Sequence, residues 1–209
     1  MIVDDENDWI TVIKNMLKPY PDIVVAGIAE NEKEIYKILN ETEIDIIIMD
    51  INLTSNNKDG IYIAAEVSKN FDVKVLMLSG LNPQEVAVDS FNAGAVSFVS
   101  KENYADIPHE IRKAYYGNPA MNELLSDFRL LKKDKLLSTL TSSEIELFEL
   151  LEQGYKKSDI QKMIFKTEST LKNQINSILK KLNVKNTKEA VEKVNMRGLY
   201  KPKSIDSNE

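Results

Sequence analysis

The sequence predicts an α/β doubly wound sheet of five parallel strands, followed by a small all-α domain of four helices. Within residues 1–117, short β-branched runs alternate with segments of helical period, which is typical of a parallel sheet covered on both faces. Gly117, Asn118 and Pro119 interrupt this alternation, and only helical patterns follow. The formal charge changes at the same place, from −10 over residues 1–120 to +4 over residues 121–209.

Five segments are expected to be strands. Four are β-branched runs at Ile23–Ile28, Ile44–Met49, Val73–Leu78 and Ala95–Val99. The third of these runs is apolar at nearly every position, as in a strand that is buried on both faces. Met1–Val3 is predicted to be a short first strand, and the sequence leaves open whether an upstream start codon lengthens it.

Helices are expected wherever apolar residues recur at intervals of three and four. In the first part of the chain they are Asp8–Leu17, Glu32–Asn40, Ile61–Phe71, Pro83–Ala93 and Tyr104–Tyr116. In the last part they are Ser142–Gln153, Ser158–Ile164, Glu168–Leu182 and Thr187–Met196. These patterns predict one domain over residues 1–117, a helical linker over 118–138, a second domain over 139–201 and a disordered tail over 202–209.

The residue types exclude several kinds of site. The chain has no cysteine, so disulfides, thiolate metal sites and cysteine nucleophiles are absent. Its single histidine disfavours a histidine-rich metal site and a Ser/His/Asp triad. No apolar run approaches the length of a membrane span, and no secretory leader is recognisable at the amino terminus. These observations favour a cytoplasmic protein with no membrane partner.

Carboxylates, a hydroxyl and an ammonium group stand at the expected carboxyl ends of the strands. They are Asp4 and Asp5 after the first strand, Asp50 after the third, Ser79 after the fourth and Lys101 after the fifth. Ligands of open parallel sheets bind beyond this edge. A set of oxygen ligands suits Mg²⁺, which also bridges phosphate oxygens. The pattern therefore predicts phosphoryl transfer to a carboxylate, with Asp50 as the nucleophile.

Two further groups would contact the phosphoryl group once it is attached. The Lys101 ammonium would pair with one phosphoryl oxygen, and the Ser79 hydroxyl would bond to another. Because the second contact exists only in the modified protein, it would work as a switch.

Four strings resemble the receiver domain of bacterial response regulators, a flavodoxin-like fold, and the resemblance covers residues 1–117. They are Val3–Glu6, Ile47–Asp50, Leu76–Gly80 and Ala93–Lys101. The resemblance implies that Asp50 is the phosphoacceptor for a sensor histidine kinase.

The same resemblance assigns the neighbouring residues. Asp5, Asp50 and the backbone carbonyl of Asn52 would hold Mg²⁺, with Asp4 in the outer shell, and Ser79 and Phe98 would be the switch pair. Three features depart from the family pattern: Leu53-Thr54 replaces Met-Pro, the loop through Ser55–Gly60 is longer, and Glu102 replaces a proline.

A helix-turn-helix is predicted in the second domain. The stretch Gly154–Lys188 holds nine lysines against two acidic residues, a net charge of +7. Its helices Ser158–Ile164 and Glu168–Leu182 are joined by a short connection, as in a helix-turn-helix. The longer helix has an inward stripe of leucine and isoleucine, which we assign to the core. Its opposite face carries polar side chains that suit base edges and phosphates, namely Ser169, Lys172, Asn173, Asn176 and Lys180.

Residues 140–191 resemble the LuxR-type (NarL/FixJ-like) DNA-binding domain. The matching residues include Leu140-Thr141, Glu144, Gly154, Thr170–Asn173 and Lys181-Leu182. The resemblance implies that three side chains face the major groove: Lys172, Asn173 and Asn176. Four others would lie against backbone phosphates: Thr170, Gln174, Ser177 and Lys185. The fourth helix would form the dimer contact on DNA, with Lys193, Asn195 and Met196 as participants.

Three positions depart from that family pattern. Gln161 stands in place of a small packed residue, Phe165-Lys166 replaces a small-then-aliphatic pair, and Gln174 replaces a histidine. The target sequence therefore does not transfer from relatives.

The predicted function is that of a response regulator without enzymatic activity of its own. It would take a phosphoryl group on Asp50, form a homodimer and bind double-stranded promoter DNA, and a contact with RNA polymerase is compatible with this role. One alternative is a receiver that works through protein contacts without phosphorylation. Another is a Mg²⁺-dependent phosphatase with a carboxylate nucleophile, which is disfavoured because Asn52 stands where such enzymes have a second aspartate.

Overall fold

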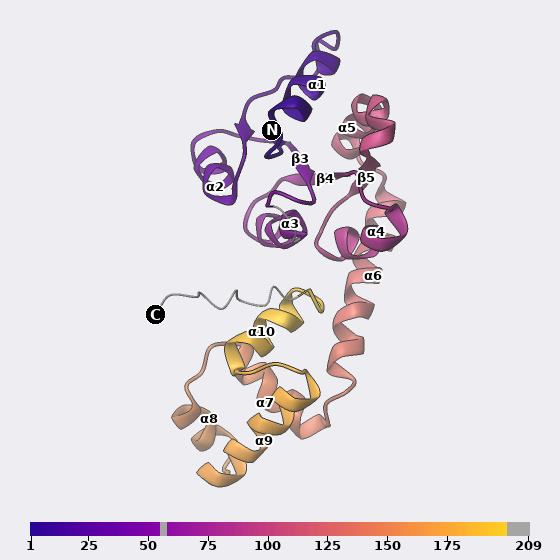
Figure 1. Ribbon diagram of the computed structural model, residues 1–209. Helices are drawn as coiled ribbons and strands as arrows, with labels where there is room; N and C mark the ends of the chain where they lie inside the picture. Colours follow the sequence, from indigo (N-terminus) through magenta and orange to yellow (C-terminus); the bar gives the residue numbers. More distant parts are fainter. Residues whose placement is uncertain (55–57, 200–209) are drawn as a thin grey trace. The chain divides into compact units, whose positions relative to one another are not determined.

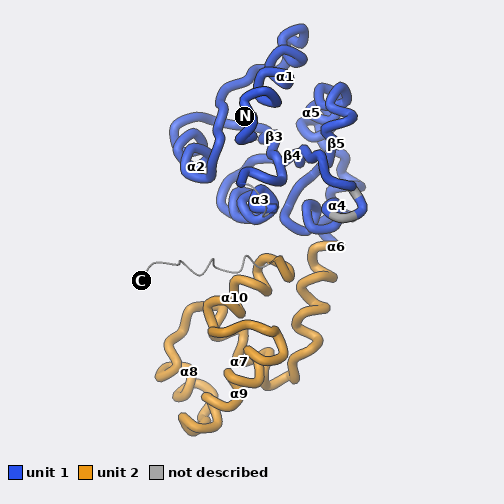
Figure 2. Tube along the Cα trace, in the orientation of Figure 1, with its two compact units in different colours: residues 1–127 blue, residues 128–209 orange. Residues whose placement is uncertain are grey.

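The computed structural model describes residues 1–54 and 58–199. The tail expected to be disordered, 202–209, and part of the Ser55–Gly60 loop lie outside the described residues. The chain divides into two compact units, residues 1–127 and 128–209 (Figure 2). No helix in the described part of the chain combines the length and the apolar character needed to cross a membrane.

A sheet of five parallel strands, ordered β2-β1-β3-β4-β5, forms the centre of the first unit. The strands are β1 (Ile2–Val3), β2 (Ile28–Ala29), β3 (Ile46–Asp50), β4 (Lys74–Ser79) and β5 (Ser97–Ser100). The strand order reverses beside β1, and such a switch point is where open α/β sheets bind ligands. The predicted doubly wound parallel sheet is confirmed.

Helices cover both faces of this sheet. They are α1 (Asn7–Leu17), α2 (Glu32–Glu41), α3 (Asp59–Asn70), α4 (Pro83–Asn92) and α5 (Ile107–Tyr116), with a 3-10 helix η1 (Lys101–Asp106) before α5. Figure 1 shows α1 and α5 on one side of the strands and α2, α3 and α4 on the other. On the first side, Ile13 of α1 and Ile107 of α5 share a buried apolar core with Ile48 and Leu78. This packing fixes the strand ends that carry the acidic residues.

Several element bounds differ from the sequence-based expectation, and those of β2 and α5 differ most. β2 was expected over Ile23–Ile28, but it is a strand only at Ile28–Ala29, because its partner β1 offers just two paired positions. Ile23 and Val25 still pack against the core, so their apolar character reflects burial rather than strand pairing. Helix α5 begins at Ile107 rather than Tyr104, since proline at position 108 suits a first helical turn.

The second unit is entirely helical within the residues that the structure describes. The long helix α6 (Pro119–Leu137) leads into it, and α7 (Ser142–Glu152), α8 (Lys157–Met163), α9 (Glu168–Lys181) and α10 (Thr187–Asn195) follow. Side chains of Thr141, Thr167 and Asn186 cap the starts of α7, α9 and α10. Phe148 is fully buried, in an apolar core with Ile175 and other side chains of these helices. The four-helix second domain agrees with the prediction.

Candidate functional site

Three carboxylates gather at the carboxyl edge of the sheet. One ligand oxygen from each of Asp4, Asp5 and Asp50 lies within 4.8 Å of the others. Asp4 and Asp50 are buried, whereas Asp5 is exposed. Because β1 and β3 are hydrogen-bonded neighbours, the residues that follow or end them must lie close together. The structure thus brings together the acidic residues that the sequence placed at this edge.

The Lys101 ammonium group lies among these carboxylates. Its Nζ is 3.0 Å from Asp4 Oδ2, 3.2 Å from Asp50 Oδ1 and 3.8 Å from Glu6 Oε1. Desolvation lowers the pKa of Lys101, but the charges of Asp50 and Asp4 outweigh it and raise that pKa. Lys101 is therefore a cation that neutralises part of the acidic cluster.

Asp50 has an unusually basic carboxylate. Burial is the largest cause and raises its pKa to about 6, the neighbouring Lys101 opposes this rise, and the charge of Asp4 adds to it. The backbone N–H of Asn52 donates to Asp50 Oδ2 at 3.0 Å. One oxygen of Asp50 thus contacts the lysine, and the other is held by the chain that follows it.

A network around Asp59 and Gly60 holds the loop after Asp50. Asp59 is buried and accepts hydrogen bonds from Leu53 N at 2.9 Å and from Thr54 Oγ1 at 2.7 Å. A Cβ on Gly60 would lie 1.9 Å from the carbonyl oxygen of Asp50, so only glycine fits. Sequence reasoning treated this Asp-Gly pair only as the end of a loop. Its place at the start of a helix was the available signal for a structural role.

The residues at this edge fit a small divalent cation. Asp4 Oδ2 is buried without an aligned hydrogen-bond donor among the described residues, so its 3.0 Å contact with Lys101 is an ion pair only. Asp5 leaves an exposed carboxylate beside it. Hard oxygen ligands of this kind suit Mg²⁺. Asp5 and Asp50, with Asp4 behind them, are the residues that would hold the ion.

Ser79 and Phe98 occupy adjacent strands. Ser79 ends β4 and is 1% exposed, and its hydroxyl oxygen accepts a hydrogen bond from Leu81 N at 3.0 Å. Phe98 lies in β5 opposite Met77 and is half-buried. Ser79 lies one residue beyond Leu78, the register partner of Asp50. A switch role for this pair remains a prediction.

Trp9 of α1 is partly buried and lies beside the acidic cluster. Lys101 Nζ is 5.0 Å from the centroid of the Trp9 ring, and Tyr104 makes an edge contact with the ring at 6.0 Å. This arrangement joins α1 to η1, which are distant in sequence, so no local pattern could have indicated it. The single tryptophan of the chain therefore lies next to the lysine of the site.

Addition of Mg²⁺ is expected to change the fluorescence of Trp9 in a saturable manner. A cation bound by Asp5 and Asp50 competes with Lys101 for the carboxylates, and movement of the ammonium group alters the surroundings of the ring. The measurement is an emission titration at constant ionic strength. Asp5→Asn should weaken the response. Constant emission in the unaltered chain would count against cation binding here.

The polar face of α9 is largely open. Thr170, Lys172, Asn173 and Asn176 are exposed, and so is Lys185 beyond the end of the helix. The other two predicted phosphate contacts, Gln174 and Ser177, are half-buried and turned toward α7: Gln174 Nε2 donates to Ser143 Oγ at 3.1 Å. These two side chains join α9 to α7 in this structure. The assignment of all seven residues to DNA remains a prediction.

Glu144 links the start of α7 to α9. It accepts hydrogen bonds from Thr141 N at 2.7 Å, from Ser177 Oγ at 2.6 Å and from Lys181 Nζ at 2.6 Å. Desolvation raises the pKa of Glu144, but the bonds from Lys181, Ser177 and Thr141 outweigh it and lower the pKa to about 2. Thr141 and Glu144 form a capping box three residues apart in sequence, whereas the contacts of Glu144 to α9 depend on helix packing.

The connection between α8 and α9 has a left-handed residue. Phe165 has a φ of 51° and is 95% exposed. The neighbouring Lys166 points inward instead, where its Nζ donates to Ser143 Oγ at 2.7 Å and to Gln174 Oε1 at 2.9 Å. Gln161 is half-buried, and its carbonyl accepts from Lys166 N. Three of the unusual residues noted in the sequence, Gln161, Lys166 and Gln174, thus form one local network, and Phe165 stands outside it.

The predicted dimer contacts on α10 are partly engaged within the protomer. Lys193 Nζ donates to the carbonyl of Leu182 at 2.9 Å, and Met196, just after the helix, is 9% exposed. Asn195 is half-buried. A role in dimer formation therefore stays a prediction for these three residues.

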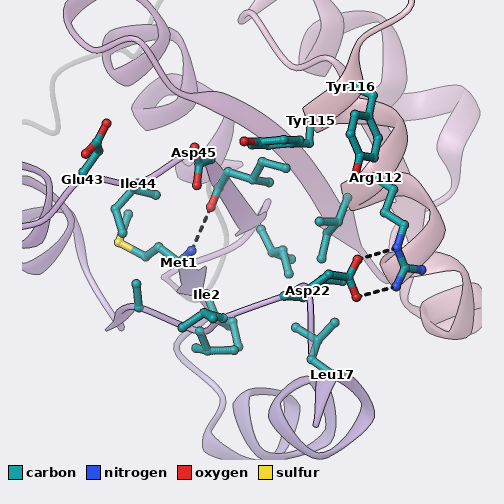
Figure 3. A pocket seen from close by; sticks show the side chains of 17 residues that line it. Met1, Ile2, Leu17, Asp22, Glu43, Ile44, Asp45, Arg112, Tyr115 and Tyr116 are labelled. Atoms are coloured by element: carbon teal, nitrogen blue, oxygen red, sulfur yellow. Dashed lines mark hydrogen bonds and ion pairs between the residues drawn. The ribbon is translucent and has the colours of Figure 1, made fainter. Parts of the chain in front are cut away.

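A cavity of about 270 Å³ lies at the opposite edge of the sheet, where the strands begin. Figure 3 shows its lining, with the Met1 amine hydrogen-bonded to the carbonyl of Ile46 at 2.8 Å and Asp22 paired with Arg112. Burial lowers the pKa of the Met1 amine to about 6, against the opposing charge of Asp45. The acidic cluster is not part of this cavity, so the cavity is not the candidate phosphorylation site.

Comparison with protein families identifies both halves of the chain. The response regulator receiver domain matches residues 1–112, and the luxR family of bacterial regulatory proteins matches residues 138–194. This chain is a LuxR-type response regulator. The response regulator protein VraR of Staphylococcus aureus is 30% identical to it over 196 residues, which cover 91% of this chain and 93% of VraR. The transcriptional regulatory protein DegU of Brevibacillus brevis is 27% identical, over 91% of this response regulator and 90% of DegU.

Solved structures share the fold of this response regulator. RcsB of Salmonella typhimurium aligns with a TM-score of 0.51 at 20% identity, covering 95% of this chain and 96% of RcsB. RcsB bound to the promoter rprA with the phosphomimetic BeF3⁻ aligns with a TM-score of 0.51 at 19% identity, covering 92% of this chain and 96% of the RcsB chain. At these identities the likeness establishes the fold, and the site must be argued from its own residues.

Proposed function

We propose that this response regulator accepts a phosphoryl group on Asp50 from a sensor histidine kinase and then binds promoter DNA as a homodimer. The observation that carries the proposal is the carboxylate cluster of Asp4, Asp5 and Asp50 around the Lys101 ammonium group. An Asp50 oxygen would attack phosphorus, and the bond from phosphorus to the donor histidine would break. Lys101 would then pair with a phosphoryl oxygen in place of a carboxylate.

Mg²⁺, when bound, would neutralise the charge that gathers on the phosphoryl oxygens. The protein supplies the arrangement around it. Asn52 N fixes one Asp50 oxygen, Asp59 holds the loop, and Ser79 stands one residue beyond the strand partner of Asp50. A phosphoryl group on Asp50 would give the Ser79 hydroxyl a new acceptor, and Phe98 on the adjacent strand would respond.

The second unit supplies the DNA-binding part of the proposal. Exposed Lys172, Asn173 and Asn176 form a polar face on α9 that suits the major groove, with Thr170 and Lys185 directed to phosphates. The relative RcsB has been solved on promoter DNA. The relatives are transcription regulators, and we infer a cytoplasmic location, where a bacterial promoter and RNA polymerase are accessible. We propose a receiver domain over residues 1–117, a helical linker over 118–138 and a DNA-binding domain over 139–201.

The phosphorylation step is tested by intact mass after incubation with Mg²⁺ and acetyl phosphate. A single phosphoryl addition is expected in the unaltered chain and none in Asp50→Asn, since the variant lacks the attacking oxygen. Omission of Mg²⁺ should also prevent the addition. If a folded protein with native Trp9 emission gains no phosphoryl group, the alternative of a receiver that works without phosphorylation replaces the proposal.

The DNA contact is tested with duplexes selected from a random pool by the phosphorylated chain. Asn173→Ala should weaken binding to the selected duplex by about 10- to 100-fold and relax its sequence preference, as expected for a base-edge contact. Lys185→Ala should weaken binding to all duplexes alike and reduce its salt dependence. Lys14→Ala, a surface lysine of the first unit, is the control. Equal affinity of Asn173→Ala and the unaltered chain would remove α9 from the interface.

A further inference from the structure

Helix α6 carries an apolar stripe that is exposed among the residues the structure describes. Met121, Leu124 and Leu131 are 46%, 62% and 67% exposed, and Phe128 lies between them, half-buried. The four residues follow one another at intervals of three, four and three. On an α-helix this spacing brings them onto one face, and it is the a and d pattern of a helix that pairs with another helix.

The last turns of α6 contact the second unit through another side of the helix. Lys133 Nζ pairs with Glu152 Oε1 of α7 at 3.0 Å, and Leu137 packs against the apolar core of the second unit. Lys133 and Leu137 lie about one turn apart, on the side of the helix opposite Phe128 and Leu131. Leu130, near the same side of the helix, is 58% exposed, so that side is only partly covered. The residues of the stripe are not among those that pack against the core of the second unit.

Charges beside the stripe select the partner and its direction. Asp127 takes the g position of one heptad and Lys132 the e position of the next, five residues later. In a parallel pair these positions meet, so Asp127 of each copy would face Lys132 of the other. In an antiparallel pair Asp127 would instead face Asp127. No ion pair joins Asp127 to another residue in the described ranges 1–54 and 58–199.

The Lys132 side chain is already placed for such a seam. Its Nζ lies 5.4 Å from the centroid of the Phe128 ring, so its aliphatic stem runs beside the stripe. Lysine at e positions commonly covers an apolar seam with its stem and keeps its charge at the rim.

We propose that α6 pairs in parallel with α6 of a second copy through Met121, Leu124, Phe128 and Leu131. The inference deepens the proposed function, on which it rests, by giving the homodimer a contact outside α10. Two heptads are shorter than a self-sufficient coiled coil needs. The pairing therefore adds to the other contacts of the dimer and stabilises the phosphorylated, DNA-bound form.

Disulfide trapping tests the seam directly, because the chain has no cysteine of its own. Leu124→Cys and Leu131→Cys, treated with Mg²⁺, acetyl phosphate and a mild oxidant, should each form covalent dimers. Ser126→Cys, which is exposed on the opposite side of α6, should stay monomeric under the same conditions. A mixture of differently tagged Leu124→Cys and Leu131→Cys chains should yield few mixed dimers, since a parallel pair brings like positions together. Equal trapping at position 126, or mainly mixed dimers, would overturn the proposal.

Exchange of charges provides a second test without cysteine. Asp127→Lys should raise the dimer dissociation constant about three- to tenfold in sedimentation experiments, and so should Lys132→Asp. The double variant should return close to the unaltered value. If the unaltered chain dimerises but these variants do not differ from it, only the α6 seam is wrong. If the phosphorylated chain stays monomeric with and without the selected duplex, the proposed dimer is wrong as well.

Discussion

Asp50→Asn is expected to raise the stability of the metal-free first unit by about 1–3 kcal/mol at pH 7, while it removes the phosphoacceptor. Asp50 is 4% exposed, and the pKa of its carboxyl group in the folded chain is about 6 against an ordinary value of 3.8. The folded state therefore disfavours the charged form that predominates at pH 7. Asparagine keeps the size of the side chain and removes the charge, and Asp4 remains as a partner of Lys101.

Trp9 provides the measurement, because it is the single tryptophan and belongs to the first unit. Its emission during urea unfolding in EDTA reports the stability of that unit alone. Asp72→Asn, at an exposed position, is the matched control and should change stability by less than about 0.5 kcal/mol. A midpoint for Asp50→Asn at or below that of the unaltered chain would contradict the expectation.

The difference in stability between Asp50→Asn and the unaltered chain depends on pH in a defined direction. Folded Asp50 binds its proton more tightly than unfolded Asp50, because its folded pKa is raised to about 6. Between the unfolded value of 3.8 and about 6, the folded state holds the extra proton, so lowering the pH stabilises the unaltered chain. The advantage of Asp50→Asn is therefore complete above pH 6 and disappears as the pH approaches 4. Mg²⁺ should also reduce the stability advantage of Asp50→Asn at pH 7, since the ion stabilises only a protein that binds it.

The position of the acidic site could be predicted from the sequence because it depends on strand order. Parallel strands end at one edge, so Asp4, Asp50 and Lys101 converge once the strands are recognised. The distances within the cluster could not be predicted. Lys101 is shared between two carboxylates and stands over Trp9 because α1 and η1 pack together, and neither helix carries a local signal of that contact.

The bounds of β2 show a different limit of prediction from the sequence. Ile23, Val25 and Ile28 of the apolar run pack against the core, whereas Val24 is 79% exposed. A strand also needs a hydrogen-bonded neighbour, and β1 offers only Ile2 and Val3. In the second unit, the outward and inward faces of α9 could be read from helical period. Gln174 and Ser177 lie between those faces, and their partners, Ser143 and Glu144, belong to α7. Residues at such borders depend on helix packing, which helical period alone does not specify.

Glu144→Ala is expected to destabilise the second unit by about 2–4 kcal/mol, because it removes a buried carboxylate with several donors. The variant leaves Lys181 and Ser177 of α9 without their acceptor and Thr141 N without its capping partner. Glu144→Gln keeps the cap but loses the charge, so it should fall between the alanine variant and the unaltered chain. Glu146→Ala, exposed on the same helix, is the matched control.

Two spectroscopic signals separate the units in this experiment. Helical circular dichroism should show an earlier urea transition in Glu144→Ala, whereas Trp9 emission, which belongs to the first unit, should keep its midpoint. A shift of the Trp9 midpoint by the same amount would mean that the units unfold together and that the effect is not local to Glu144.

The pH dependence of stability provides the sharpest test of whether the charge of Glu144 is what stabilises the second unit. The pKa of Glu144 is lowered from 4.5 to about 2 in the folded chain, so its ionised form stabilises the second unit fully above pH 4.5. That contribution is lost as the pH falls from 4.5 toward 2, where the folded carboxylate also takes up a proton. The stability gap between the unaltered chain and Glu144→Gln should therefore close over this interval. A gap that stays constant down to pH 2 would assign the loss to packing rather than to the charge that joins α7 to the recognition helix.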